Sequence, residues 1–229
     1  MLFRLSKVLL LAFSISLVSC DNTEEPQKEL SYLALGDSYT IGESVNEADR
    51  WPEQLVDTLI TSGITIERPR IIAKTGWRTD QLKDSLQIDP GRFRKYDLVS
   101  LLIGVNNQVQ GRTLDRFETE LIELIQMAIN LADGDMTRVF VLSIPNYGKT
   151  QFGIYLGGEA ISQEIAQFNA VIREVCDNLN IRYFNITPIS EEVINDTSLL
   201  GSDNFHPSGK MYKLWVDLMF EDIYQSLLR

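Results

Sequence analysis

Histidine and cysteine are scarce in this sequence of 229 residues, which contains one His and two Cys. Three such side chains cannot supply the four nitrogen and sulfur ligands of a zinc site, and two cysteines do not build a disulfide scaffold. A chain of this length buries about 70% of its unfolded surface without such supports. We therefore expect one domain that folds without a metal ion or disulfides, in which any imidazole chemistry uses His206.

Basic residues are also few, because the chain has 21 Lys and Arg but 32 Asp and Glu, which gives a net charge of −11. Binding to nucleic acid relies on cations that displace the counterions of the phosphate backbone. The sequence therefore predicts no nucleic-acid partner, and its acidic surface favours solubility.

The N-terminal segment has the layout of a secretory signal, with Arg4 and Lys7 before an apolar run from Val8 to Val18. A membrane-spanning helix needs roughly 20 apolar residues, so this run is too short to be one. We expect the segment to be removed from the mature protein and to play no part in the fold.

The end of this segment, Leu17-Val18-Ser19-Cys20, resembles the lipobox of bacterial lipoproteins. The resemblance implies that residues 1–19 are a signal peptide, that Cys20 carries lipid, and that residues 20–29 form a polar tether. We then expect a protein held by its lipid at the bacterial cell envelope, facing the periplasm or the cell surface. An ordinary cleaved signal is the alternative.

From Leu30 onward, short apolar runs alternate with longer amphipathic ones, which is typical of an α/β protein. We expect strands at Tyr32–Leu35, Ile66–Ala73, Leu98–Ile103, Val139–Ile144 and Ile181–Phe184. Helices are expected at Pro52–Thr61, Thr79–Leu86, Leu114–Leu131, Ile161–Leu179 and about Ser208–Leu228. Strands rich in Val, Ile and Leu suit a parallel sheet buried on both faces. The sequence predicts a three-layer α/β/α sandwich, flavodoxin-like, with about five parallel strands in one domain of residues 30–229.

Cys176 belongs to an apolar stripe at helical spacing within the fourth of these helices. That position favours a buried structural thiol over a nucleophile.

Short polar motifs follow three of the expected strands, and a fourth motif precedes the last helix. They are Gly36-Asp37-Ser38-Tyr39-Thr40, Thr75-Gly76-Trp77, Gly104-Val105-Asn106-Asn107 and Asp203-Asn204-Phe205-His206-Pro207. Ligands of open α/β sheets bind outside the carboxyl ends of the strands, where these motifs are expected. In this order the four motifs resemble the SGNH (GDSL-like) hydrolase family, and the match spans Leu30 to Arg229.

The resemblance implies that Ser38 is a nucleophile, His206 its general base and Asp203 the acid that orients the imidazole. The chemistry supports these roles independently, because a serine hydroxyl is a weak nucleophile until a base takes its proton. An Asp three residues before a His can hold the Nδ1–H, which leaves Nε2 free for the serine. Pro207 suits the first turn of the following helix.

The family resemblance also implies an oxyanion hole made by the backbone N–H groups of Ser38 and Gly76 and the side-chain amide of Asn106. Such donors stabilise the charge that develops on the carbonyl oxygen. The third motif departs from the usual Gly-x-Asn-Asp, because Asn107 replaces the Asp, and we expect this to affect the loop geometry more than the chemistry. The Gly-x-Ser-x-Gly elbow of α/β-hydrolases is absent, since Thr40 occupies its last position.

Residues 145–158, between the fourth strand and its helix, form a longer connection than is usual in α/β folds. Tyr147, Phe152 and Tyr155 either line an acyl or sugar pocket or pin this segment to the core, and whether it forms a lid stays open. Trp77 and Arg78 lie beside Gly76 and are the better candidates for substrate contacts, although a surface salt bridge is the commoner fate of such an arginine.

These observations favour an anchored serine esterase that hydrolyses an O-acyl or thioester bond through an acyl-enzyme, without a cofactor. Its partner would be a small-molecule ester, such as a carbohydrate O-acetyl group or a small lipid ester. The alternative is a non-catalytic, flavodoxin-like lipoprotein that binds a phosphate or flavin at the Gly36–Thr40 loop. The combination of Ser38, Asp203 and His206 favours the enzyme. The sequence leaves the acyl group, the alcohol and the oligomeric state open.

Overall fold

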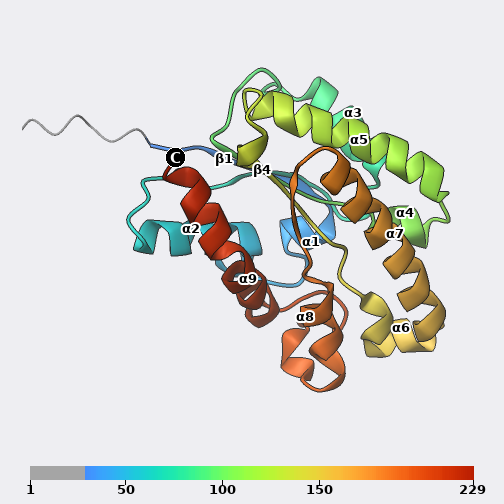
Figure 1. Ribbon diagram of the computed structural model, residues 1–229. Coiled ribbons are helices and arrows are strands. Elements are labelled where there is room, and N and C mark those ends of the chain that lie inside the picture. The colour runs from blue at the N-terminus through green and yellow to red at the C-terminus, as the bar shows by residue number, and fades with distance from the viewer. Residues whose placement is uncertain (1–28) are drawn as a thin grey trace, which may run out of the picture.

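Five parallel strands form the centre of the fold in the computed structural model (Figure 1). The structure describes residues 29–229, so the expected signal peptide, Cys20 and nearly all of the tether lie outside the described residues. The strands are β1 (Tyr32–Gly36), β2 (Arg70–Ala73), β3 (Leu98–Leu102), β4 (Val139–Leu142) and β5 (Arg182–Phe184). They lie in the order β2-β1-β3-β4-β5, which is the flavodoxin-like order.

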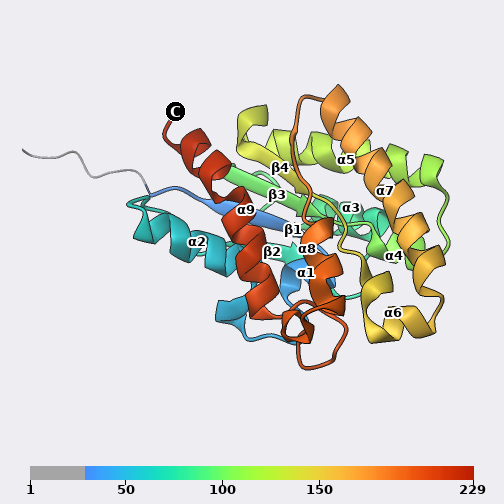
Figure 2. The ribbon, with the colours of Figure 1, turned by 60° about the horizontal axis from the view of Figure 1, so that its bottom comes forward.

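The five helices expected from apolar periodicity are all present. They are α2 (Trp51–Thr61), α3 (Thr79–Ile88), α5 (Leu114–Leu131), α7 (Gly158–Asn178) and α9 (Gly209–Leu227). In Figure 2, α2 and α9 cover one face of the sheet, and α3, α5 and α7 cover the other. The expected three-layer α/β/α sandwich is therefore confirmed.

Four short helices were not expected, because four or five residues are too few to show a helical period. They are α1 (Ser38–Ile41), α4 (Val105–Val109), α6 (Gln151–Tyr155) and α8 (Thr187–Glu191). The described chain also has the 3₁₀ turns η1 (Glu47–Asp49), η2 (Met136–Arg138), η3 (Tyr147–Lys149), η4 (Glu192–Ile194) and η5 (Thr197–Leu199). Each of the four short helices follows the carboxyl end of a strand, which is the edge where ligands of this fold class bind.

Strand β2 is shorter than expected. Ile66 makes an isolated bridge with Leu30, and the regular strand begins at Arg70. Pro69, which precedes that strand, has no N–H to donate to a sheet ladder.

The core is formed by strands β1, β3 and β4, in which every residue is buried, together with the apolar faces of the long helices. Trp51 on α2 and Trp215 on α9 are fully buried between these two helices and the sheet. Cys176 is also fully buried, and burial raises the pKa of its thiol to about 12, so it is a structural residue as expected.

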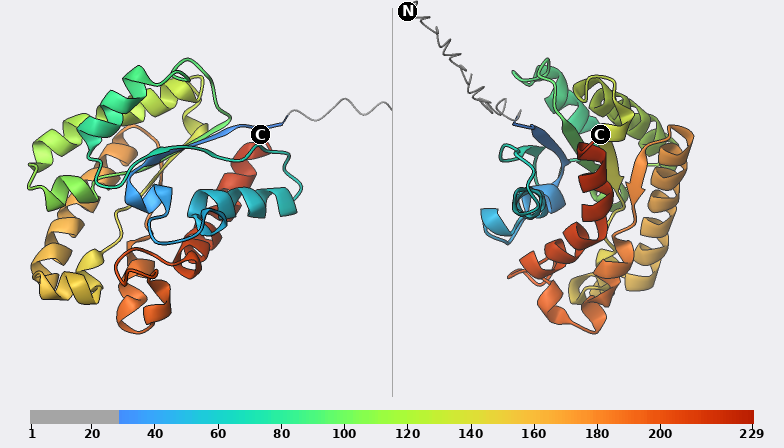
Figure 3. Two further views of the ribbon diagram at one scale, coloured as in Figure 1. Left: turned by 180° about the vertical axis from the view of Figure 1, so that it is seen from behind. Right: turned by 60° about the vertical axis from the view of Figure 1, so that its left-hand side comes forward.

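We call the side of the sheet where its parallel strands begin the amino edge, and the side where they end the carboxyl edge. Different parts of the chain lie at these two edges. Residue 29 and the C-terminus lie at the amino edge, whereas the short helices α1, α4, α6 and α8 lie toward the carboxyl edge (Figure 3). Among residues 29–229, no helix is long and apolar enough to cross a membrane.

Candidate active site

A cleft of about 190 Å³ opens at the carboxyl ends of β1, β2 and β3. It is lined by Ser38, Tyr39, Thr75, Gly76, Val105, Asn106, Val109, Phe205 and His206. The fold thus brings Ser38, Gly76, Asn106 and His206 together from four separate loops. Asp203 lies behind the imidazole, so all five residues singled out by the motifs meet at one place.

Ser38 is the first residue of α1, at the sharp turn that ends β1. Asp37 is the N-cap of this helix, and its Oδ1 accepts a hydrogen bond of 3.0 Å from the backbone N–H of Tyr39. At Gly36, an added Cβ would lie 2.4 Å from the carbonyl oxygen of Leu102, so glycine is required for this turn. The N–H of Ser38 is one of the first in the helix, which have no intrahelical acceptor and are free for another.

Asp37 itself is fully buried beneath the cleft. Its Oδ2 has no hydrogen-bond partner among the residues that the structure describes. Burial raises the pKa of this carboxyl to about 7, although the hydrogen bond from Tyr39 acts in the opposite direction. An acid that is largely neutral below pH 7 therefore lies directly before the candidate nucleophile.

The turn before α9 holds the imidazole in one orientation. His206 Nδ1 lies 2.6 Å from Asp203 Oδ2, while Asp203 Oδ1 accepts the backbone N–H groups of Phe205 and His206, each at 2.9 Å. Partial burial raises the pKa of the Asp203 carboxyl, but these hydrogen bonds outweigh it and the net shift is downward. An ionised Asp203 accepts the Nδ1–H and leaves Nε2 for the serine.

Aromatic rings also fix the imidazole. The ring of Phe205 lies edge-on to it at 4.8 Å between centroids, and the ring of Tyr39 lies at 5.7 Å. The position of Pro207 differs from expectation: Ser208 is the N-cap and α9 begins at Gly209, so Pro207 precedes the helix. It forms a bridge with Leu200 instead.

The candidate oxyanion donors come from two further loops. Gly76 has a φ of +83°, which disfavours any residue with a side chain, although a Cβ there would meet no other atom. Asn106 lies in α4, and its Nδ2 donates to the carbonyl of Trp77 at 3.0 Å. An amide nitrogen has two hydrogens, so one can tie Asn106 to the loop of Gly76 while the other points at a substrate oxygen.

Asn107 is fully buried and links α4 to the start of α3. Its Oδ1 accepts from the N–H of Thr79 at 3.1 Å, and its Nδ2 donates to the hydroxyl of Thr79 at 2.6 Å. That hydroxyl in turn donates to Glu120, whose other oxygen accepts from Arg116 at 2.7 Å. Because the only hydroxyl hydrogen of Thr79 goes to the Glu120 carboxylate, the residue at 107 has to donate a hydrogen to that hydroxyl. The amide of Asn107 can do so, whereas a carboxylate at 107 could not.

Trp77 and Arg78 lie beside the cleft, and neither is among its lining residues. Arg78 is bidentate to Asp80, with both contacts at 3.0 Å, and also donates to Gln110. Gln110 bonds back to the carbonyl of Gly76 at 3.4 Å. In the structure Arg78 therefore braces the glycine loop through an internal salt bridge.

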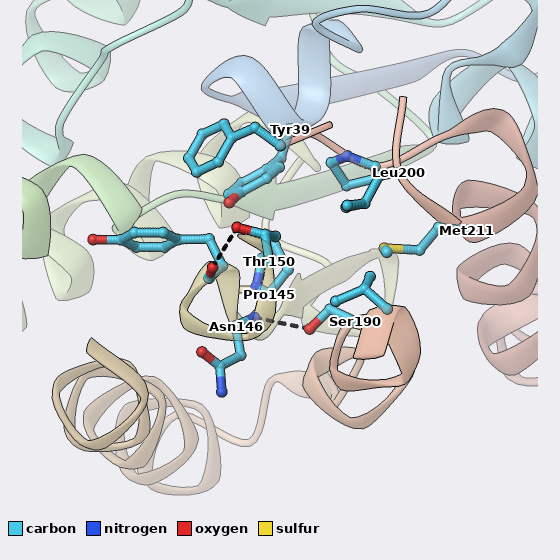
Figure 4. A pocket seen from close by; sticks show the side chains of 11 residues that line it. Tyr39, Pro145, Asn146, Thr150, Ser190, Leu200 and Met211 are labelled. Atoms are coloured by element: carbon cyan, nitrogen blue, oxygen red, sulfur yellow. Dashed lines mark hydrogen bonds between the residues drawn. The ribbon is translucent and has the colours of Figure 1, made fainter. Parts of the chain in front are cut away.

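The base of the 145–158 segment is firmly attached to the core (Figure 4). Asn146 N–H donates to Ser190 and the hydroxyl of Thr150 to the carbonyl of Tyr147, each at 2.8 Å. The cavity between these residues measures about 10 Å³, which is room for a single water molecule at most. Tyr147 is buried and its hydroxyl donates to Gln108 at 2.8 Å, so this tyrosine pins the segment.

The outer part of the same segment, α6, differs from its base. Four large apolar side chains of α6 and its C-cap are more than half exposed: Phe152 (53%), Ile154 (60%), Tyr155 (86%) and Leu156 (53%). The Phe152 ring contacts that of Phe205 at 5.3 Å, and Phe205 contacts His206. An apolar surface is therefore continuous from α6 to the candidate catalytic base.

Sequence reasoning overlooked several residues of the site. Asp37 and Phe205 lie inside the four motifs. Nothing in the sequence showed that Asp37 would be buried or that the Phe205 ring would contact Phe152 and His206. Val109 lines the cleft three residues after Asn106, which only the unexpected helix α4 explains. Within residues 29–229, no group of three or more His, Cys, Asp or Glu side chains is arranged to hold a metal ion.

Comparisons with known proteins agree with this fold. The chain resembles the solved structure of TesA with a TM-score of 0.65 and 16% identity, over 86% of this chain and 99% of that one. It resembles the esterase EstA from Pseudoalteromonas sp. with a TM-score of 0.62 and 17% identity, over 88% of this chain and 100% of that one. It also resembles Axe2, an acetylxylan esterase from Geobacillus stearothermophilus, with a TM-score of 0.66 and 19% identity, over 85% of this chain and 94% of that one. At these identities the likeness shows the fold. No curated protein matches the chain in sequence. The model of the GDSL-like lipase/acylhydrolase family matches residues 34–214, so the chain belongs to that family of ester hydrolases.

Proposed function

We propose that the protein is a serine esterase that cleaves an O-acyl or thioester bond through an acyl-enzyme on Ser38. The observation that carries this proposal is the meeting of Ser38, Gly76, Asn106 and His206 in one cleft, with Asp203 bonded to His206 Nδ1 at 2.6 Å.

In this mechanism His206 Nε2 takes the proton of Ser38 as Oγ attacks the carbonyl carbon of the ester. The carbonyl oxygen becomes an oxyanion, which accepts hydrogen bonds from the N–H groups of Ser38 and Gly76 and from Asn106. Asp203 stabilises the imidazolium, which then gives its proton to the departing alcohol or thiol. Water attacks the acyl-serine by the same steps, releasing the acid and restoring Ser38.

The cleft favours a small acyl group. Its volume is about 190 Å³, and Val105, Val109 and Phe205 supply an apolar wall. The structural neighbour Axe2, described as an acetylxylan esterase, supports an O-acetyl carbohydrate as substrate. The exposed side chains of α6 favour a second candidate, a lipid ester with an apolar chain that extends out of the cleft.

Labelling with a fluorophosphonate tests the mechanism, and the structure of EstA inhibited by monoethylphosphonate is a precedent for such phosphorus reagents in this fold. We expect the wild type and Ser62→Ala, a change at an exposed serine, to be labelled, and Ser38→Ala to be unlabelled and inactive. Absence of both labelling and hydrolysis of short p-nitrophenyl esters would contradict the proposal. A p-nitrophenyl ester series from acetate to palmitate separates the two substrate classes by kcat/KM.

We also propose that lipid on Cys20 anchors the protein at the bacterial cell envelope. The lipobox-like Leu17-Val18-Ser19-Cys20 supports the anchor. Residue 29 lies at the amino edge of the sheet and the cleft at the carboxyl edge, so an anchored protein would present its cleft away from the membrane. A mature mass equal to the unlipidated chain from Cys20 would refute the anchor.

A further inference from the structure

A second apolar surface lies at the amino edge of the sheet, on the opposite side from the cleft. A groove of about 420 Å³ lies between the C-terminal ends of α3 and α5 and the loop that leads into β3. It is lined by Leu86, Gln87, Arg92, Phe93, Lys95, Met127, Asn130 and Leu131. Beside it Ile88 exposes 81% and Phe93 78% of their surface, more than any other aliphatic or phenylalanine side chain in the described chain.

The rim of this groove is basic, although the protein as a whole is acidic. Residues 91–95 carry three cations and no acid in a chain with a net charge of −11. The guanidinium of Arg92 lies 4.5 Å from the centre of the Phe93 ring and donates to the backbone carbonyl of Asp89 at 3.3 Å. A cation is therefore held directly over an exposed aromatic ring.

The other two cations have partners but remain accessible. Arg94 pairs with Glu67 and leaves 46% of its side chain exposed. Lys95 donates to the carbonyl of Asn130, lies 3.6 Å from Asp133 and leaves 53% exposed. Both can turn toward an external phosphate at the modest cost of a surface ion pair.

The described chain begins beside this loop. The carbonyl of Leu30 accepts from the N–H of Glu67 at 2.8 Å, and the carboxylate of Glu67 pairs with Arg94. Twenty-eight residues precede Glu29, and they include the apolar run that follows Arg4 and Lys7. Whatever holds the preceding segment at a membrane would therefore bring this face to the bilayer.

We propose that this amino-edge face, formed by Ile88, Phe93 and the cations at 92, 94 and 95, docks on the surface of an anionic phospholipid bilayer. Ile88 and Phe93 insert at the boundary of headgroups and acyl chains, and the cations contact lipid phosphates. The apolar surface of α6 has one cation beside it in sequence, Lys149, which pairs with Glu159. That surface is continuous with the cleft, which suits a substrate instead. This docking is independent of the ester chemistry.

Vesicle flotation tests the proposal with an unacylated chain that begins at residue 21 and retains every described strand and helix. We expect it to float with phosphatidylglycerol and phosphatidylethanolamine vesicles at low ionic strength, and weakly with phosphatidylcholine alone. Phe93→Asp should reduce the bound fraction at least tenfold, because a charge enters the apolar boundary. Arg92→Gln should weaken binding about fivefold, the equivalent of about 1 kcal/mol per cation near the surface.

Tyr155→Asp is the matched control, since it places the same charge on the exposed apolar surface of α6 and should float as the wild type does. Thermal midpoints of all variants check that the fold is retained. The proposal is overturned if the wild type does not float, or if Tyr155→Asp loses binding while Phe93→Asp does not. Sedimentation that shows a dimer abolished by Phe93→Asp, without flotation, would assign the face to a second copy of the chain instead.

Discussion

Two aspartates act on the same cleft from opposite environments. Asp203 lies in a surface turn, leaves 35% of its side chain exposed and accepts three hydrogen bonds, and its pKa is lowered. Asp37 is fully buried, accepts one hydrogen bond from the backbone of Tyr39, and its pKa is raised to about 7. The difference teaches that the balance between burial and hydrogen bonding decides the direction of each shift: burial dominates at Asp37, whereas hydrogen bonds outweigh it at Asp203.

The two residues have correspondingly different roles in the proposed mechanism. An ionised Asp203 stabilises an imidazolium that forms and disappears in each catalytic cycle. Asp37 shapes the turn that presents Ser38, and its burial disfavours a negative charge next to a developing oxyanion. The predictions below test this contrast, from the largest expected effect to the smallest.

Asp203→Asn should lower kcat by about 10⁴-fold, because an amide nitrogen facing Nδ1 favours the imidazole tautomer that places a hydrogen on Nε2. The thermal midpoint should change little, since Asn keeps an oxygen for the N–H groups of Phe205 and His206. Steady-state kinetics on p-nitrophenyl acetate measure the effect. A loss of less than tenfold would mean that Asp203 only closes the turn.

Asn106→Ala should lower kcat by about 10²–10³-fold with a smaller change in KM, because it removes a donor to the oxyanion. Asn106→Asp has nearly the same volume and should lose at least as much, since it adds a negative charge at that point. If the Asp variant is much more active than the Ala variant, packing rather than hydrogen-bond donation explains the role of Asn106.

Asp37→Asn should change how stability depends on pH. Because the pKa of Asp37 is raised from 3.8 to about 7, its contribution to stability is complete below about pH 4 and is lost as the pH rises to about 7. Asp203 has the opposite sign, since its contribution is lost as the pH falls through its lowered pKa. The thermal midpoint of Asp37→Asn relative to wild type should therefore rise by several degrees between pH 5 and pH 8. A difference that does not vary with pH would show that Asp37 is ionised in the fold across this range.

Asn107→Asp, which restores the residue usual in the family, should have the smallest effect on activity, less than tenfold in kcat, because this side chain does not line the cleft. Thr79 has one hydroxyl hydrogen and cannot serve carboxylates at both 107 and 120. The variant should lose about 1–3 kcal/mol of stability, because one carboxylate is left without its hydrogen-bond donor. Thermal unfolding measures this, and a variant as stable as the wild type would contradict the account of the Glu120 network.

The long elements of the fold were predictable because each shows its own period. The range Leu114–Leu131 was expected and observed without change, since its apolar residues repeat along a helix face. The short helices α1, α4, α6 and α8 were missed because their positions depend on the strands that they follow. The strand expected from Ile66 begins only at Arg70, because the effect of Pro69 on the ladder was overlooked.

The site can likewise be divided into features that the sequence predicted and features that it did not. Four motifs in order placed Ser38, Gly76 and Asn106 after strands and His206 before the last helix, which is where the structure has them. Their order did not show that Arg78 would be held by Asp80 and Gln110, or that Tyr147 would be buried while Tyr155 is 86% exposed. Those outcomes depend on neighbours that are distant in sequence.

By itself, the sequence determined the layered α/β architecture, the family and the residues available for chemistry, because periodicity and motif order are local properties of the chain. Only the tertiary structure decided the charge and orientation of those residues. The pKa of Asp37 depends on complete burial, and the orientation of His206 depends on the Asp203 turn and the rings of Tyr39 and Phe205. Burial and ring contacts arise when separate segments pack together, and no local pattern of residues specifies them.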